Sequence, residues 1–244
     1  MTDFYVGYHD PSPPRVRRFQ RRFAAASLVI AGAAAVVIAS GQRQLPAAVF
    51  EFGTIRSFEG FVVADPYPSL IVPRGPVNSR FLLVGPGKSG ADALVEAVAG
   101  GWATMDGTLA YRDGQSVIQV EPGSVARAGG ALPPSIAEAV LGERSMEGEI
   151  VGAKCYLGVM NPGSGIAHRA CADLCIRGGI PPLLMVRHED GATEGIILAG
   201  PDGEALGEEL SGLIATPVGV TGNLVRKGAT TVLHVDPAEI RRLH

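Results

Sequence analysis

Charged and aromatic residues are scarce in this chain of 244 residues: 18% are charged and 6% aromatic, while 46% are apolar. A long coiled coil would be rich in Glu, Lys and Leu, and a disordered chain would be poor in apolar residues, so both classes are excluded. Gly and Pro, with 33 and 18 residues, make up about a fifth of the chain. This composition predicts a folded protein with many turns.

An excess of positive charge is also missing, because the formal net charge is −3. Residues 1–22 hold five Arg against two Asp, whereas the remainder is net acidic. A nucleic-acid-binding protein needs Lys and Arg gathered on a folded face, and here the basic charge is a short tail. We therefore expect no nucleic-acid partner.

The common catalytic and nucleotide-binding motifs are absent. The turn Gly85-Pro86-Gly87-Lys88-Ser89 resembles the end of a phosphate-binding loop, but Leu82 stands where that motif requires Gly. A turn that ends a strand is the favoured interpretation, so we expect no nucleotide. No Gly-x-Ser-x-Gly, His-Glu-x-x-His or Cys-x-x-Cys-His pattern occurs. We assign no catalytic residues and do not expect an enzyme.

One long apolar run lies near the N-terminus. Residues 23–40 carry no charge, and as a helix these 18 residues would span roughly 27 Å, close to the ~30 Å hydrocarbon core of a bilayer. The five arginines of residues 1–22 directly precede the run. By the positive-inside rule, residues 1–22 form a cytoplasmic tail and residues 23–40 a transmembrane helix in the lipid bilayer. We expect the inner membrane of a bacterium, with the main domain in the periplasm.

A cleaved signal peptide is the alternative interpretation of this run. The run is long for a signal peptide, and Ile38 is too large for the −3 position before a cut after Ser40. The preceding 22 residues are also long for the basic region of a signal peptide. These points favour an uncleaved anchor.

The chain beyond the anchor contains two copies of one pattern. Three segments recur at an offset of 115 residues: residues 81–86 match 196–201, residues 106–109 match 221–224, and residues 120–122 match 235–237. A fourth pair, residues 58–60 and 146–148, is offset by 88. Since the offset grows from 88 to 115, the second copy carries about 27 extra residues between its first strand and its Gly-Pro turn.

Each copy predicts a set of short strands. Val and Ile cluster in apolar runs of four to six residues, and Gly, Pro and Asp stand between these runs. Copies that contain several short strands suit a small closed barrel of the OB type. We expect a short helix over residues 89–100 in the first copy and over residues 204–215 in the second. We therefore predict a mainly β protein with two tandem OB-like barrels, over residues 55–125 and 145–240. A split sandwich is the alternative fold.

All three cysteines fall within the extra residues of the second copy, an insert that we place at residues 154–180. A helix is predicted over 166–177. Ser164 is a good N-cap for it, and Gly178 is a good C′ residue just after its end. Positions i, i+3 and i+7 of a helix share one face, and a cysteine of the preceding strand can reach that face. The side chains gathered in this way are Cys155, His168, Cys171 and Cys175.

Three kinds of chemistry fit this group. In an oxidising compartment Cys155 would form a disulfide with Cys171 or Cys175, which lie on one helix with Cβ atoms too far apart to pair with each other. Alternatively, the three sulfurs and His168 would bind a metal ion (Zn, Cu or Fe) or haem iron, because a Cys₃His set is a competent tetrahedral ligand group. A redox-active dithiol is the third interpretation.

The insert resembles a motif of uncharacterised secreted bacterial proteins. Residues 148–183 contain, in order, the Cys-Tyr-Leu that starts at Cys155, a Gly-rich loop, His-x-x-Cys-Ala-x-x-Cys and Gly-Ile-Pro. The resemblance implies a defined structural unit and no particular activity. The anchored barrel architecture also resembles the haem chaperones of cytochrome c maturation. Their His-x-x-x-Tyr signature is missing, since alanines stand four residues after His168, His188 and His234.

These features favour a binding role over catalysis. We expect a single-span accessory subunit of a membrane complex, of respiratory or redox type, whose partners are other membrane-protein subunits. A metal- or haem-binding protein that transfers electrons or carries a metal with the insert is the alternative. The candidate contacts with a partner lie in the tail and at the end of the insert: Tyr5, Tyr8, Gly178, Gly179 and Pro181.

The topology can be tested by protease treatment of intact spheroplasts. Residues 1–22 should be protected from the added protease, because the membrane encloses them, and residues beyond Leu45 should be cut. N-terminal sequencing of the purified protein provides the control. A mature N-terminus at Gly41 would contradict the anchor and favour a signal peptide.

Overall fold

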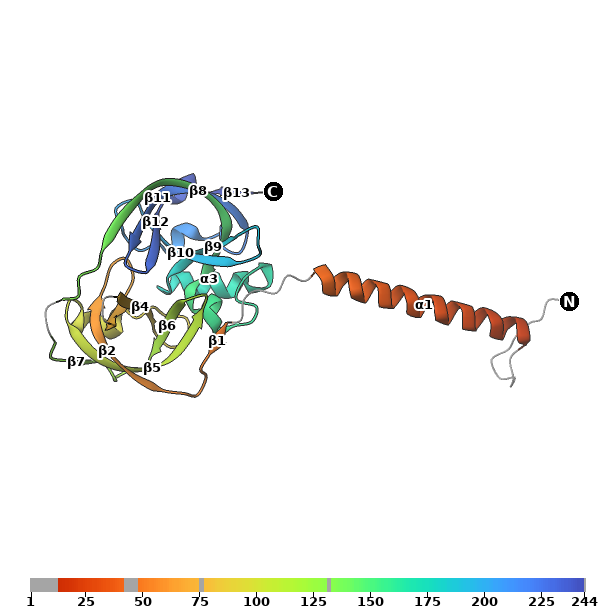
Figure 1. Ribbon diagram of the computed structural model, residues 1–244, viewed down its shortest axis with the longest axis horizontal. Helices are drawn as coiled ribbons and strands as arrows, with labels where there is room; N and C mark the ends of the chain where they lie inside the picture. Colours follow the sequence, from red (N-terminus) through yellow and green to blue (C-terminus); the bar gives the residue numbers. More distant parts are fainter. Residues whose placement is uncertain (1–12, 42–47, 75–76, 131–132, 244) are drawn as a thin grey trace. The chain divides into compact units, whose positions relative to one another are not determined.

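The computed structural model describes residues 13–41, 48–74, 77–130 and 133–243. These residues belong to two units, an N-terminal helix and a β-rich body (Figure 1). The candidate contact residues Tyr5 and Tyr8 lie outside the described residues.

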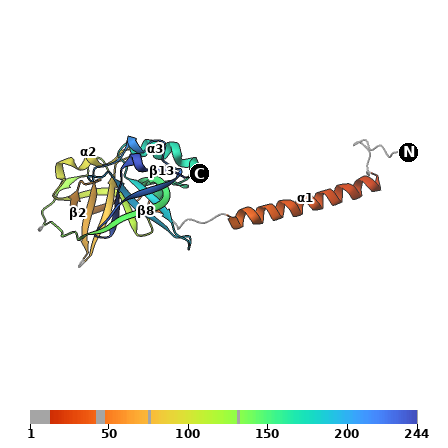
Figure 2. The same cartoon turned by 90° about the horizontal axis from the view of Figure 1, so that it is seen from above.

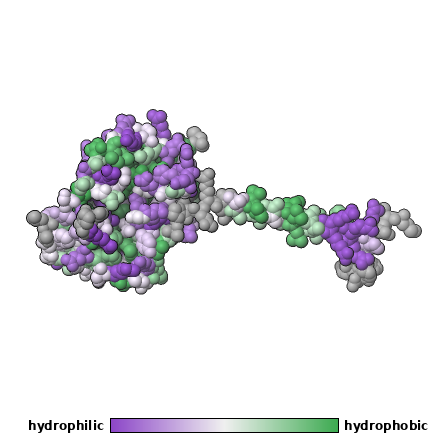
Figure 3. Space-filling model, in the orientation of Figure 1, coloured by the Kyte–Doolittle hydropathy of each residue, from purple (hydrophilic) through white to green (hydrophobic). Residues whose placement is uncertain are grey.

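The apolar run forms a single helix, α1, over Pro14–Gly41. The helix begins nine residues before the predicted start at Phe23, because Pro is favoured at the first helical position and Arg is a good helix former. By length and composition, Pro14–Ser40 can cross a membrane, as an anchor or as a signal sequence. Figure 3 shows hydrophilic residues gathered at the N-terminal end of α1 and hydrophobic residues along the rest.

The first barrel closes with five strands. Adjacent strands are antiparallel, except that β4 and β6 pair in parallel and so close the barrel together with the β5–β6 hairpin. Two short strands, β1 (Val49–Phe50) and β7 (Ala126–Arg127), pair with β5. The barrel strands are β2 (Arg56–Val63), β3 (Ser69–Arg74), β4 (Val77–Val84), β5 (Trp102–Arg112) and β6 (Gln115–Val120).

The second barrel repeats this topology. Its closing pair, β10 with β12, is again parallel, and β11 and β12 again form a hairpin. A short strand, β13 (Arg241–Arg242), pairs with β11. The barrel strands are β8 (Glu138–Gly152), β9 (Pro182–Arg187), β10 (Thr193–Ala199), β11 (Pro217–Lys227) and β12 (Thr230–His234).

The register of the strands confirms the predicted repeat. In the parallel pair of the first barrel Leu82 faces Val117, and in the second barrel Ile197 faces Val232. Both residues of this pair are therefore displaced by the offset of 115 that the sequence shows. The glycines of the first strands are equivalent too. A Cβ at Gly60 would lie 2.6 Å from the Ile71 carbonyl oxygen, and a Cβ at Gly148 would lie 2.6 Å from that of Met185.

The extra residues of the second copy lie between its first and second strands. Val62 pairs with Leu70 in the first barrel, and Ile150 pairs with Leu184 in the second, so the separation grows from 8 to 34 residues. This excursion contains a π-helical turn, η2 (Cys155–Val159), a 3₁₀ turn, η3 (Ile166–His168), and the helix α3 (Arg169–Arg177). The predicted helix over 166–177 is confirmed.

The ends of this helical segment differ from the predicted caps. Ser164 makes no capping hydrogen bond, and Gly165 occupies the position before η3. At the other end Gly179, with φ +91°, is the left-handed residue, while Gly178 has φ −83°. The amide of Ile180 bonds to the Cys175 carbonyl and that of Gly179 to the Ile176 carbonyl, which is the Schellman pattern. The helix therefore ends at Arg177 as predicted, but the left-handed residue that follows it is Gly179 instead of Gly178.

The two other predicted helices are shorter than expected. Residues 89–100 contain one helical turn, α2 (Asp92–Val95), followed by a 3₁₀ turn, η1 (Glu96–Val98). Residues 204–215 contain only the 3₁₀ turn η4 (Glu208–Leu210), because glycines on both sides of this turn disfavour a longer helix. Figure 2 shows α2 and α3 on the same side of the strands.

Three groups of buried side chains form the core. One fills the first barrel, a second fills the second barrel, and a third lies between the barrels and beneath the insert. The third group contains Tyr156, Cys155 and Cys175 of the insert. It also contains Tyr67, whose hydroxyl donates to the Leu198 carbonyl at 2.9 Å and accepts from the Leu206 amide at 2.8 Å. The barrels therefore share a continuous apolar interface with specific polar contacts.

A second contact between the barrels involves the turn that follows β4. The amide of Gly90 donates to the Gly178 carbonyl at 2.7 Å. A Cβ at Gly178 would collide with the carbonyl oxygen of Lys88. Only a glycine at the end of α3 therefore allows the turn to approach this closely.

The replacement Gly178→Ala tests this contact. We expect it to lower the free energy of unfolding by about 1–3 kcal/mol, the usual cost of overpacking, as measured by urea denaturation. Gly129→Ala is the matched control, because a Cβ at Gly129 would meet no atom within 4 Å. Equal stabilities of the two variants would contradict the close contact.

Candidate metal centre

The insert brings cysteine and histidine side chains together in one place. The sulfurs of Cys155 and Cys171 and one ring nitrogen of His168 all lie within 4.8 Å of one another. Cys155 comes from η2, just after β8, whereas the other two residues lie on consecutive turns before and within α3. Cys175, one helical turn further, is in hydrogen-bonding contact with Cys155 and Cys171. The structure thus groups Cys155, His168 and Cys171 within ligand distance, and places Cys175 next to the two cysteines but outside that group. We call these four residues the Cys/His cluster.

Most of the Cys/His cluster is enclosed. Cys155 and His168 are each 4% exposed and Cys175 is 2% exposed. Cys171 is only partly buried, so it is the member of the cluster nearest to solvent. A buried ligand set with one open member permits entry of an ion.

A lysine of the first barrel completes the site. Lys88 Nζ lies 2.8 Å from the sulfur of Cys171 and 3.9 Å from that of Cys175. Lys88 sits in the Gly-Pro-Gly-Lys-Ser turn after β4, here called the lysine turn (residues 85–90). No motif indicates this role of Lys88, although one signal is present in the sequence: the matching turn of the second copy, at residues 200–203, has no lysine.

A second lysine holds the lysine turn in place. Lys154, next to Cys155 in the chain, is only 3% exposed. Its Nζ donates to the carbonyl oxygens of Gly85 and Gly87, at 2.8 and 2.9 Å. Because a buried ammonium must be hydrogen-bonded, this contact fixes the lysine turn against the insert.

A third basic residue, on the first barrel, packs against the insert. The guanidinium of Arg112, on β5, lies 4.4 Å from the centre of the Tyr156 ring. Arg112 is 6% exposed, and its Nε and one of its terminal nitrogens have no hydrogen-bond partner. This stacking joins η2 to the first barrel through a cation–π contact.

The two buried cysteines differ in charge. The thiol of Cys155 donates to Cys175, and this bond together with the positive charge of Lys88 lowers the pKa of Cys175 to about 6. The same hydrogen bond and burial raise the pKa of Cys155. At neutral pH Cys175 is therefore a thiolate and Cys155 a thiol in the metal-free protein. The contact with Cys171 raises the pKa of Lys88, so its ammonium stays charged.

The histidine is poised to be a neutral ligand. Burial and the charge of Lys88 lower the pKa of His168, so its imidazole is neutral at pH 7. Its Nε2 is buried and has no hydrogen-bond partner. A buried nitrogen without a partner is costly, and an ion held between the sulfurs and this ring would satisfy it. The donor set of three sulfurs and one imidazole fits Zn, Cu(I) or Fe.

The expected disulfide is absent. All three of Cys155, Cys171 and Cys175 are free. The physical reason is the arrangement of partners: Cys175 accepts the hydrogen bond of Cys155, and Lys88 occupies the position next to the sulfur of Cys171. The sulfurs therefore face polar partners instead of being bonded to one another.

The candidate partner contacts at the end of the insert have intramolecular roles. Gly178 and Gly179 pack on the lysine turn, and Pro181 is buried. Pro181 is therefore not available to a partner in this structure. A partner contact at Gly178 stays a prediction. The two other histidines within the described residues lie elsewhere: His188 is 3.4 Å from Glu194, and His234 is 3.2 Å from the Gly200 carbonyl oxygen.

Comparison with known proteins gives no assignment. No protein-family model matches the chain, and no curated protein sequence matches it.

The charge of the Cys/His cluster can be tested by titration of the thiolate ultraviolet absorbance in metal-free protein. One thiolate should appear as the pH rises through about 6, because the pKa of Cys175 is lowered. In Lys88→Gln this step should move to higher pH, since a stabilising charge is lost. Lys227→Gln, which alters a lysine paired with Glu138, should leave it unchanged. A first ionisation near the ordinary thiol pKa in the wild type would contradict the assignment.

Proposed function

We propose that this chain is a membrane-anchored protein that binds one thiophilic metal ion in the Cys/His cluster, and that it carries the ion or uses it in electron transfer. Cys155, His168 and Cys171 would hold the ion, with Cys175 as the fourth ligand. The observation that carries this proposal is the grouping of a His168 ring nitrogen with the sulfurs of Cys155 and Cys171. The buried Nε2 of the same ring, which has no hydrogen-bond partner, supports it.

The electrostatics of the site agree with this role. Thiolates are the form of cysteine that binds metals, and Cys175 is already deprotonated at neutral pH in the metal-free protein. Lys88 offsets the negative charge that thiolate ligands would bring to the site. Binding would also release the proton of Cys155, so affinity should rise with pH.

The partly exposed Cys171 favours a carrier over a purely structural site. Transfer of an ion needs a ligand that an incoming partner can reach, and Cys171 is the partly exposed member of the Cys/His cluster. A redox-active ion such as copper would instead support electron transfer, which zinc cannot. Metal analysis of the protein purified from its own membrane separates these two uses.

The accessory-subunit role is a second candidate, favoured by exposed apolar residues that flank the ligands in the insert. Met160, Ile166 and Leu174 are 44%, 75% and 48% exposed. Such residues beside a metal site suit docking of a subunit in the same membrane. The two functions are compatible, since an anchored carrier must contact the protein to which it gives its ion.

Metal titration of the full-length, detergent-solubilised apoprotein tests the proposal. Wild-type protein should bind one equivalent of Cu(I) or Zn(II), measured by competition with a chromophoric chelator. Cys155→Ser and His168→Gln should each weaken the affinity by about tenfold or more, because even residues that only orient a ligand cost about 10–100-fold.

His188→Gln is the matched control, since it removes an exposed histidine outside the Cys/His cluster. It should bind as the wild type does. Unchanged stoichiometry and affinity in both ligand variants, with correctly folded protein by circular dichroism, would refute the proposal.

A further inference from the structure

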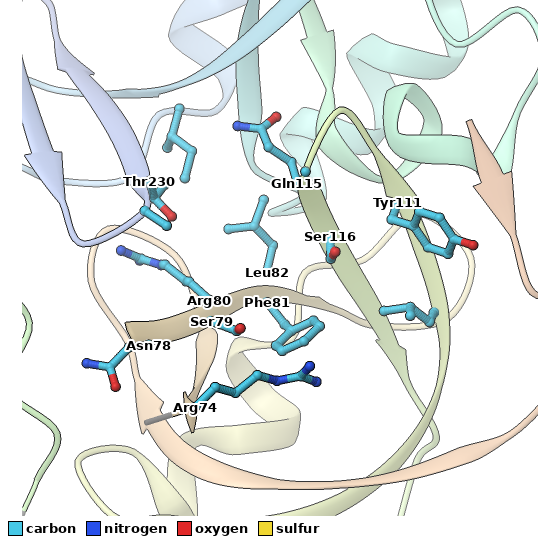
Figure 4. Close-up of a pocket in the computed structure, with 14 residues that line it drawn as sticks. Arg74, Asn78, Ser79, Arg80, Phe81, Leu82, Tyr111, Gln115, Ser116 and Thr230 are labelled. Atoms are coloured by element: carbon cyan, nitrogen blue, oxygen red, sulfur yellow. The ribbon is translucent and has the colours of Figure 1, made fainter. Parts of the chain in front are cut away.

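A cavity of about 390 Å³ lies between the barrels, away from the Cys/His cluster. Its walls come from β3 and β4, the β5–β6 hairpin, and the second barrel at Ile197 and Thr230. Figure 4 shows the side chain of Arg80 leaving β4 toward the Thr230 end of this cavity, with Leu82 and Ser116 in its middle.

The strand register explains why the cavity exists. The parallel pairing of β4 with β6 begins only at Leu82 and Val117. The residues before this point on both strands have no partner across the seam, so the strands diverge there. The seam of the first barrel is therefore open on the side that faces Thr230.

The cavity is lined by a partly buried arginine, Arg80, that forms no ion pair among the described residues. Nε of Arg80 is fully enclosed and has no hydrogen-bond partner. Its only hydrogen bond within the described part of the chain, from one terminal nitrogen to the Asp65 carbonyl oxygen, is long at 3.3 Å. Arg80 also lines a neighbouring pocket with Asp65 and Glu138, but it forms an ion pair with neither. Burial lowers the pKa of Arg80 to about 10, so it is still charged at neutral pH.

The rest of the lining indicates what would neutralise this charge. No acidic residue is among the described residues that line the cavity, and Arg74 adds a second positive charge. Hydroxyl groups of Ser79, Ser116 and Thr230 offer further donors. The remaining walls are largely apolar and include Phe81, Leu82, Leu109 and Ile197.

We propose that this cavity binds a small organic anion, whose acidic group pairs with Arg80 while its apolar part lies against Phe81 and Leu82. A volume of about 390 Å³ falls in the usual range of small-molecule sites, about 300–1,000 Å³. Arginine is suited to a carboxylate or phosphate because its planar fork donates two parallel hydrogen bonds. This binding site is independent of the metal centre.

Calorimetry on the full-length, detergent-solubilised protein tests the proposal with benzoate and phenyl phosphate as anionic probes and benzamide as the neutral analogue. The wild type should bind at least one of the anions. Its affinity for benzamide should be at least tenfold lower than for that anion. Arg80→Gln should lose at least tenfold in affinity for that anion. Arg144→Gln, an exposed arginine of β8 away from the cavity, should bind as the wild type does.

Thermal unfolding without ligand separates binding from a structural role. Arg80→Gln should melt at the same temperature as the wild type or above it, because it removes an unpaired, partly buried charge. The anion should raise the melting temperature of the wild type only. The proposal is overturned if neither anion binds, if benzamide binds as well, or if Arg80→Gln binds normally. A strongly lowered melting temperature of Arg80→Gln would assign Arg80 to the fold instead.

Discussion

The contact of the Lys154 ammonium with the carbonyl oxygens of Gly85 and Gly87 is the interaction on which the rest of the site depends. Lys154 belongs to the insert and the two glycines to the first barrel, so this buried contact couples the two halves of the chain. It holds the lysine turn against the end of α3, where Gly178 leaves room for the backbone of Lys88. Without this approach Lys88 would not reach the sulfur of Cys171.

The position of Lys88 gives the Cys/His cluster its electrostatic character. A group of three sulfurs beside a neutral imidazole would repel its own negative charge once the thiols ionise. The hydrogen bond from Cys155 is the main cause of the lowered pKa of Cys175, and the nearby ammonium of Lys88 lowers it further. The two barrels therefore contribute different parts of the site. The second barrel supplies the candidate ligands, and the first barrel supplies the compensating cation. The same division recurs at the cavity, where Arg80 belongs to the first barrel and Thr230 to the second.

Much of the fold was predictable because it depends on local patterns. The offset of 115 residues survives as the register of the parallel closing strands, since both copies must place equivalent residues inside their barrels. The helix over 166–177 follows from short-range spacing and turn-forming glycines. The prediction of a helix over 204–215 was wrong, because glycines on both sides of η4 limit the helical segment to one 3₁₀ turn. Of the three interpretations of the cysteines, the disulfide is absent from the structure, since pairing depends on what surrounds each sulfur.

The sequence by itself determined the apolar helix, the repeat, the place of the insert and the four residues of the Cys/His cluster. These properties come from residue type and periodicity along the chain. Only the tertiary structure decided that Lys88 faces Cys171, that Cys155 donates to Cys175, and that Arg80 lies unpaired in a cavity between the barrels. The two sulfur contacts join residues that are neither neighbours in the chain nor on one helix face. The cavity around Arg80 likewise forms from segments that are distant in the chain. Charge and hydrogen bonding act over a few ångströms, so their partners are known only once the two barrels are packed together.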